Sequence, residues 1–160
     1  MNSFDGTLTI LGVITGTFLA EGTTHASIIL HAGFGTSLAM GISGFMGAYL
    51  TERSERTGEL NDDEKGENSD IHKESLFLAF VDGISPALMT FFAVIPFILA
   101  FTNIILIETA FLLSMVLMMG ELFALGLFLG KIAGKNIILH GVITVLAGVA
   151  TFLIVSILPF

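Results

Sequence analysis

Acidic side chains stand within long apolar stretches of this sequence, where a charge is costly. Asp82 lies about two turns inside one stretch, Glu121 lies past the middle of another, and Asp5 begins the first. A carboxylate at the centre of a bilayer costs about 2.5–3.5 kcal/mol on insertion scales, so each needs a partner, water, a proton or a metal ion. We interpret Asp82 as a cation ligand and Glu121 as a binding site for a proton or the cation. Asp5 is a cation ligand or, alternatively, an N-terminal helix cap.

Prolines and methionines at the same depth extend this chemistry. Pro86 and Pro96 follow Asp82 and are expected to interrupt the third apolar stretch, because proline lacks an N–H and frees a carbonyl one turn earlier. Freed carbonyls beside a carboxylate are hard oxygen ligands for a cation, and the alternative is a packing kink. Met40 and Met46 would line the pathway as thioether ligands or, alternatively, fill gaps between helices.

A short segment concentrates the charge of the chain. Of 14 acids and 6 bases, 9 acids and 4 bases lie between Glu52 and Glu74. Glu52, Glu55 and Glu59 are spaced three and four apart, so a helical continuation of the preceding stretch would place them on one side. Such a cluster could gather divalent cations through oxygen ligands. The alternative is a solvated, flexible loop, which the glycines and asparagines of the second half favour.

Composition places the rest of the chain in a membrane. Hydrophobic residues make up 54% of the 160 residues and charged residues 12%, against about 25% charged in a soluble domain. The chain has no cysteine, which excludes disulfides and thiolate metal sites, and its net charge of −8 argues against a nucleic-acid partner. We expect no enzymatic activity, because the sequence has no nucleophile–base grouping, no histidine pair on one helix and no nucleotide-binding loop.

Five apolar stretches are long enough to span a bilayer, which takes about 20 residues. Backbone groups in lipid must be satisfied internally, so we expect helices and an all-α integral membrane protein. The organisation is two transmembrane helices in residues 1–50, an acidic segment in 51–75, and three transmembrane helices in 76–160. The predicted spans are Gly6–Ala20, Ala26–Leu50, Leu76–Phe101, Ile104–Gly130 and Ile137–Leu158.

The distribution of basic residues orients these spans. All six Lys and Arg residues fall in the second and fourth connections, which lie on the same side when there are five spans. The positive-inside rule then places the N-terminus in the cytoplasm and the C-terminus outside. Glycine-rich stripes allow close helix packing or a dimer seam. Five helices are few for enclosing a polar path, which favours a homodimer.

Three segments resemble the vacuolar iron transporter family, which carries ferrous iron and manganese. They are residues 5–13 (D-G-T-L-T-I-L-G-V), 43–54 (S-G-F-M-G-A-Y-L-T-E-R-S) and 127–157, with G-K-I-A-G-K and G-V-I-T-V-L-A-G-V-A-T-F-L-I. The resemblance implies a dimer of five-helix subunits that exports a cation from the cytosol in exchange for protons. It places Asp5 on the pathway, and Glu52, Glu55 and Glu59 among the cytoplasmic glutamates that gather metal.

The sequence also departs from that pattern. The pathway methionine of the family aligns with Gly44, which leaves Met40 or Met46 as substitutes, and Ala48 replaces a glutamate. We predict a multi-pass transporter of Fe2+ or Mn2+ in a prokaryotic cell membrane, with the metal as substrate and no permanently bound cofactor. The alternatives are a passive channel for divalent cations and a non-transporting membrane scaffold or assembly protein.

Overall fold

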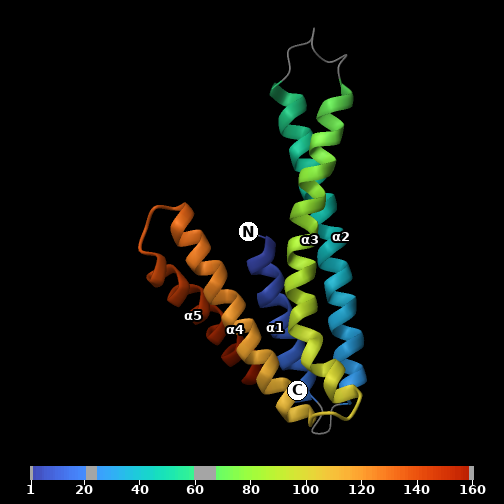
Figure 1. Cartoon of the computed structure of the whole chain (residues 1–160), viewed down its shortest axis with the longest axis vertical. Coiled ribbons are helices and arrows are strands. Elements are labelled where there is room, and N and C mark those ends of the chain that lie inside the picture. The colour runs from blue at the N-terminus through green and yellow to red at the C-terminus, as the bar shows by residue number, and fades with distance from the viewer. Residues whose placement is uncertain (1, 21–24, 60–67, 159–160) are drawn as a thin grey trace.

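The computed structural model describes residues 2–20, 25–59 and 68–158, with backbone alone for helical residues 2, 55–59, 68–75 and 78. These described residues form five α-helices joined by short connections (Figure 1). The all-helical fold predicted from the sequence is confirmed. The helices are α1 (Asn2–Ala20), α2 (Ala26–Glu59), α3 (Asn68–Phe101), α4 (Ile107–Ile132) and α5 (Ile137–Ser156).

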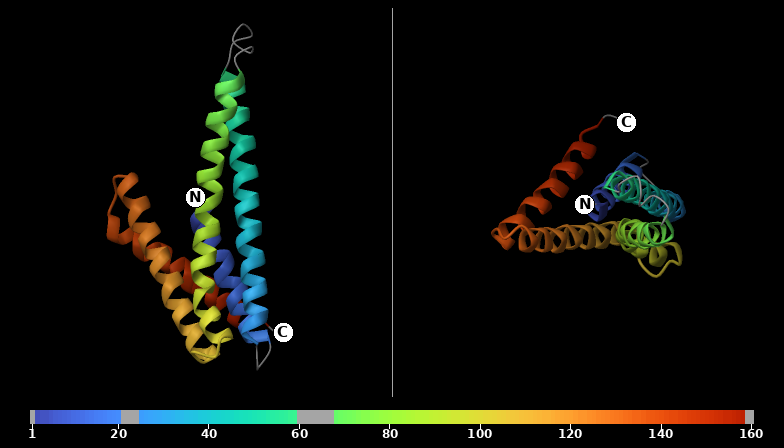
Figure 2. Two further views of the ribbon diagram at one scale, coloured as in Figure 1. Left: turned by 45° about the vertical axis from the view of Figure 1, so that its right-hand side comes forward. Right: turned by 90° about the horizontal axis from the view of Figure 1, so that it is seen from above.

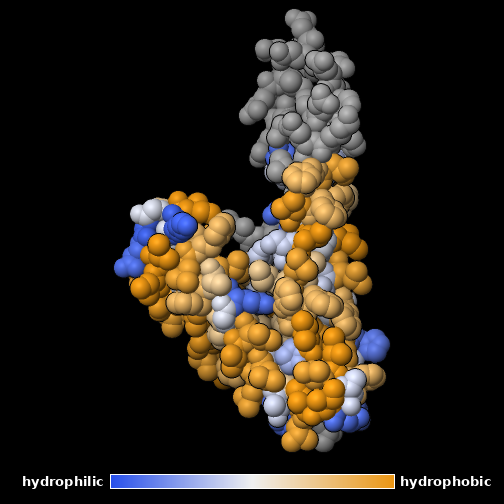
Figure 3. Space-filling view, in the orientation of Figure 1, coloured by the Kyte–Doolittle hydropathy of each residue, from blue (hydrophilic) through white to orange (hydrophobic). Residues whose placement is uncertain are grey.

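Each helix contains a segment long and apolar enough to cross a membrane. These segments run from 18 residues in α1 to 29 residues in α2. Their outward faces are apolar too, since Leu112 and Val116 of α4 are 65% and 70% exposed. Apolar side chains cover most of the face seen in Figure 3. Helices that expose this much hydrocarbon fit a lipid surround rather than water, and the prediction of a multi-pass membrane protein is confirmed to that extent.

Two antiparallel hairpins and one separate helix make up the bundle. α2 and α3 form a long upright hairpin, and α4 and α5 form a second hairpin that leans away from it (Figure 1). α1 lies between the hairpins and packs on all four other helices. Seen from above, α4 extends away from α3 and α5 turns back toward α1 (Figure 2). α1 is therefore placed to contact both halves of the molecule.

The core lies along α1. Ile10, Leu11 and Ile14 are fully buried there, and Phe97 of α3 is buried in the same cluster. Farther along α1, Phe18 stacks on Phe111 of α4 with ring centroids 4.1 Å apart.

Glycines bring helix backbones together at two seams. A Cβ added at Gly83 of α3 would lie 2.7 Å from the Phe45 nitrogen of α2. A Cβ added at Gly126 of α4 would lie 2.7 Å from the Gly141 Cα of α5. Gly12 of α1, by contrast, has open space beside it.

Two sequence expectations concerned irregular structure. In the acidic segment 51–75, the helical continuation of the second stretch is seen, because α2 continues to Glu59. The helix α3 begins at Asn68, and residues 60–67 lie outside the described part. Glutamate and arginine are good helix formers, so both helices extend beyond the apolar segments. The expected interruption of the third stretch is wrong, because α3 runs through Pro86 and Pro96. Both prolines are buried against neighbouring helices, and such packing lets membrane helices accommodate proline.

Candidate functional site

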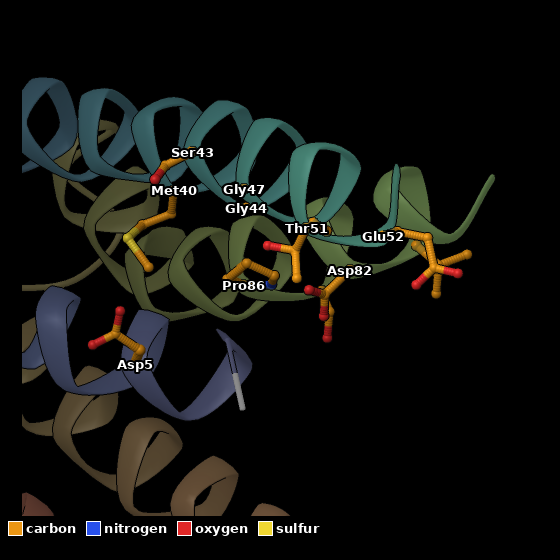
Figure 4. Close-up of a pocket in the computed structure, with 12 residues that line it drawn as sticks. Asp5, Met40, Ser43, Gly44, Gly47, Thr51, Glu52, Asp82 and Pro86 are labelled. Atoms are coloured by element: carbon orange, nitrogen blue, oxygen red, sulfur yellow. The ribbon is translucent and has the colours of Figure 1, made fainter. Parts of the chain in front are cut away.

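A cavity of about 820 Å³ lies between α1, α2 and α3. Carboxylates from all three helices line it: Asp5 from α1, Glu52 from α2 and Asp82 from α3 (Figure 4). Met40 and Thr51 of α2 contribute a thioether and a hydroxyl. Four of the residues singled out from the sequence therefore face one space, although they come from distant parts of the chain.

Small residues make room for this cavity. Gly44, Gly47 and Ala48 of α2 form one wall and project little or no side chain into the space. Gly44 also brings α2 close to α3, because a Cβ added there would lie 3.1 Å from the Gly83 Cα. The glycine stripe of the second helix, interpreted from sequence as packing, thus closes the hairpin and lines the cavity.

Asp5 is held at the cavity by the packing of the residues beside it. It lies in the first turn of α1, which begins at Asn2, so the alternative role as an N-terminal cap is not what the structure shows. Ser3 and Ser85 share a hydrogen bond that ties the start of α1 to α3. Gly6 packs on the Pro86 ring, where an added Cβ would lie 3.0 Å from the proline Cβ. Glycine at that position lets α1 approach α3 closely enough for Asp5 to line the cavity.

Asp5 and Met40 lie toward one end of the cavity, and the other two acids toward the opposite end. In Figure 4 Met40 extends from α2 toward Asp5 on α1. Asp82 and Glu52 lie on the far side of Pro86, together with Thr51. Carboxylates at both ends give the cavity a negative character that suits a cation.

Glu121 lies outside the lining of this cavity. Its half-buried side chain faces α1, where the Thr7 hydroxyl lies 3.4 Å from Glu121 Oε2 and donates to it. The single proton of this hydroxyl is shared with the Ser3 carbonyl oxygen, which lies at the shorter distance of 3.1 Å. Glu121 is therefore coupled to the segment of α1 that carries Asp5, but it does not share a space with Asp5. Thr7 was missed by sequence reasoning, although its i, i+4 spacing from Ser3 is visible there.

Met46 and the remaining glutamates stand apart. Met46 lines a different groove, on the outer face of the α2–α3 hairpin, because six residues of helix turn it away from Met40. Of the two methionines, Met40 lines the acidic cavity and Met46 does not. The side chains of Glu55 and Glu59 are outside the described part. Among the side chains that are described, no three from Asp, Glu or His come close enough together to hold a metal ion.

Two of the four histidines contact carbonyls nearby in the sequence. The Nδ1 atom of His31 lies 2.7 Å from the Ser27 carbonyl, and that of His140 lies 3.0 Å from the Asn136 carbonyl. Each of these ring nitrogens therefore contacts a carbonyl one turn earlier in its own helix or at its N-cap.

Comparison with known proteins gives one relative. The chain is 33% identical to the uncharacterized protein MJ0645 of Methanocaldococcus jannaschii over 150 residues, which cover 86% of this chain and 74% of the relative. The chain belongs to the MJ0645 family. No family model and no solved structure matches it. The description of MJ0645 carries no activity that could be compared with the residues of this MJ0645-family chain.

Proposed function

We propose that this protein transports divalent transition-metal cations, ferrous iron or manganese, across a membrane. The observation that carries the proposal is the shared cavity. Asp5, Glu52 and Asp82 come from three helices long and apolar enough to cross a membrane, and line one space of about 820 Å³. Acidic groups are rarely kept in such segments without a pathway, a proton or an ion to serve. The vacuolar iron transporter resemblance agrees with this proposal.

The donor set favours a particular class of cation. Carboxylate oxygens suit hard divalent cations, whereas the thioether of Met40 is a softer ligand. A mixed set of this kind fits Fe2+ or Mn2+ better than Mg2+ or Ca2+, which are bound by oxygen alone. The metal is the substrate, and nothing in the proposal calls for a resident cofactor or for enzymatic chemistry.

The cation would be bound incompletely by one subunit. No three acidic or histidine side chains converge among the described residues, so a cation at Asp5 would keep part of its water shell. The cavity has room for that, since one water takes about 30 Å³. A second subunit would supply further ligands, and we accordingly propose a homodimer.

The proposal also includes the orientation of the helices in the membrane and the exchange of metal for protons. The basic residues of the α2–α3 and α4–α5 connections would lie in the cytoplasm, with the N-terminus inside and the C-terminus outside. The metal would leave the cytosol of a prokaryotic cell in exchange for protons. Glu121, removed from the cavity and joined to α1 through Thr7, is proposed to bind the exchanged proton. Glu52, with Glu55 and Glu59, would gather metal at the cytoplasmic end.

Flux into proteoliposomes tests the pathway. We expect Asp5→Asn and Asp82→Asn to lower the uptake of Fe2+ and Mn2+ at least tenfold, because each removes a charge that faces the cation. Glu108→Gln is the matched control: Glu108 is an exposed acid in the first turn of α4 and does not line the cavity. Wild-type flux in both aspartate variants would reject the assigned roles.

The same vesicles separate the proposal from its alternatives. Proton antiport predicts that an outwardly directed proton gradient drives metal uptake into the vesicles. Glu121→Gln should remove this dependence on the pH gradient but leave the flux of metal down its own gradient. A passive channel would carry metal at a rate that the pH gradient does not change. A scaffold would carry none, and its acids would tolerate joint replacement by Asn.

A further inference from the structure

A second hollow lies on the outer face of the α2–α3 hairpin. It has a volume of about 380 Å³ and is separate from the acidic cavity. Its walls are apolar and open to the surroundings, since Leu38, Ile42 and Phe80 are 67%, 65% and 56% exposed. Gly41 and Gly83 lie between these walls, where the two helix backbones approach each other. The hollow is therefore an apolar groove that runs along the contact between α2 and α3.

An aromatic and basic ladder continues from the groove toward the charged end of α2. Phe45, which lines the groove, stacks on Tyr49 with ring centroids 6.4 Å apart and planes 6° from parallel. The Tyr49 hydroxyl accepts a hydrogen bond from Arg53 Nη1 at 3.1 Å. The i, i+4 spacing keeps all three side chains on one face of the helix. Along this face of α2, apolar side chains are therefore followed by an aromatic ring and then by a guanidinium group.

The dimensions of this surface match one leaflet of a bilayer. The apolar segment of α2, Ala26–Ser54, has 29 residues and is about 43 Å long at 1.5 Å per residue. A bilayer with its headgroup layers is about 40–45 Å thick, so an upright α2 would place Arg53 at the headgroup level of one leaflet. Leu38 lies about 22 Å away along the helix, near the bilayer centre.

We propose that this groove binds one acyl chain of an anionic phospholipid, with the lipid phosphate on Arg53. The chain would lie along Leu38, Ile42 and Phe45 and pass Tyr49 to reach the headgroup. Guanidinium pairs with phosphate in a bidentate geometry, and a basic side chain beside a membrane attracts anionic lipids. The groove of about 380 Å³ is lined by apolar side chains, and the guanidinium group beyond it favours an occupant that has both an apolar chain and an anionic group.

The sequence provides its own probe for this site. Tyr49 is the single tyrosine and the chain has no tryptophan, so intrinsic fluorescence reports on the ladder itself. The protein is reconstituted in vesicles of phosphatidylcholine and phosphatidylglycerol, with bromine on the acyl chains of one lipid or the other. Bromine quenches a nearby ring, and the quenching at each mole fraction gives the relative affinity of the two lipids. Each variant is normalised to its own signal in unbrominated vesicles.

We expect phosphatidylglycerol to bind about fivefold more tightly than phosphatidylcholine, the effect of one basic residue near the surface. Arg53→Gln should remove the preference. Lys131→Gln, which removes an exposed basic residue from the last turn of α4, should retain it. Equal quenching by both lipids, or a preference that survives in Arg53→Gln, would overturn the proposal. So would a tyrosine shielded from both lipids in a protein that cross-links as a dimer, because a second copy would then cover the groove.

Discussion

Replacement of Gly83 by alanine should separate α2 from α3. The added Cβ would lie 2.7 Å from the Phe45 nitrogen and 2.9 Å from both the Gly41 oxygen and the Phe45 Cα, where ordinary contacts are 3.4–4 Å. All three neighbours are backbone atoms, which cannot move aside as the tip of a side chain can. The helices must therefore move apart by about 0.7 Å or more near Gly83. Overpacking of this kind costs about 1–3 kcal/mol.

Part of that cost comes from a hydrogen bond across the same seam. Ser37 of α2 donates to the Ala87 carbonyl of α3 at 2.8 Å, one turn from Gly83. A bond of this kind within a membrane contributes about 0.6 kcal/mol on average, so its loss accounts for a minor share of the expected total.

Unfolding of detergent-solubilised protein by dodecyl sulfate, followed by circular dichroism, measures the effect. The control is Gly35→Ala on α2, where an added Cβ meets nothing within 4 Å. We expect this control to unfold at the wild-type position or slightly later, because alanine favours the helix. If Gly83→Ala unfolded together with Gly35→Ala, the close backbone approach would not contribute to the stability of the hairpin.

Two further predictions concern how α4 is attached. Ser114→Ala should lower the free energy of unfolding by about 0.6 kcal/mol, and by up to about 1.7 kcal/mol, because the fully buried hydroxyl donates to a carbonyl of α3. Ser156→Ala is the control, since its hydroxyl donates to a carbonyl of its own helix α5, and it should have no effect in the same dodecyl sulfate titration. Phe111→Leu should lower the free energy of unfolding by about 0.5–1.5 kcal/mol, because the stacking on Phe18 is lost. Phe128 of the same helix is 61% exposed, so Phe128→Leu should leave the thermal melt unchanged. Equal losses of stability in the two variants would refute a specific role for the stacked pair.

The residue pattern of the chain was enough to predict its elements. Apolar runs of membrane-spanning length predicted five helices, because a bilayer leaves the backbone no other partner for its hydrogen bonds. The connection between the third and fourth spans was predicted at residues 102–103, where Asn103 has φ 59°, but it extends to Leu106 because α4 begins at Ile107. Helix ends in water were predicted less well, since nothing in lipid physics fixes where a helix stops once it has left the membrane.

The grouping of side chains was decided by tertiary structure. Residue types alone marked Asp5, Asp82 and Glu121 as costly in lipid, but the rotation of each helix about its axis determines what each one meets. That rotation brings Asp5 and Asp82 into one cavity and turns Glu121 to Thr7. It follows from the shapes of packed neighbours, such as Gly6 against Pro86, which come from distant parts of the chain. The sequence thus determines which groups must avoid lipid, and the packing of the five helices determines which of them share a space.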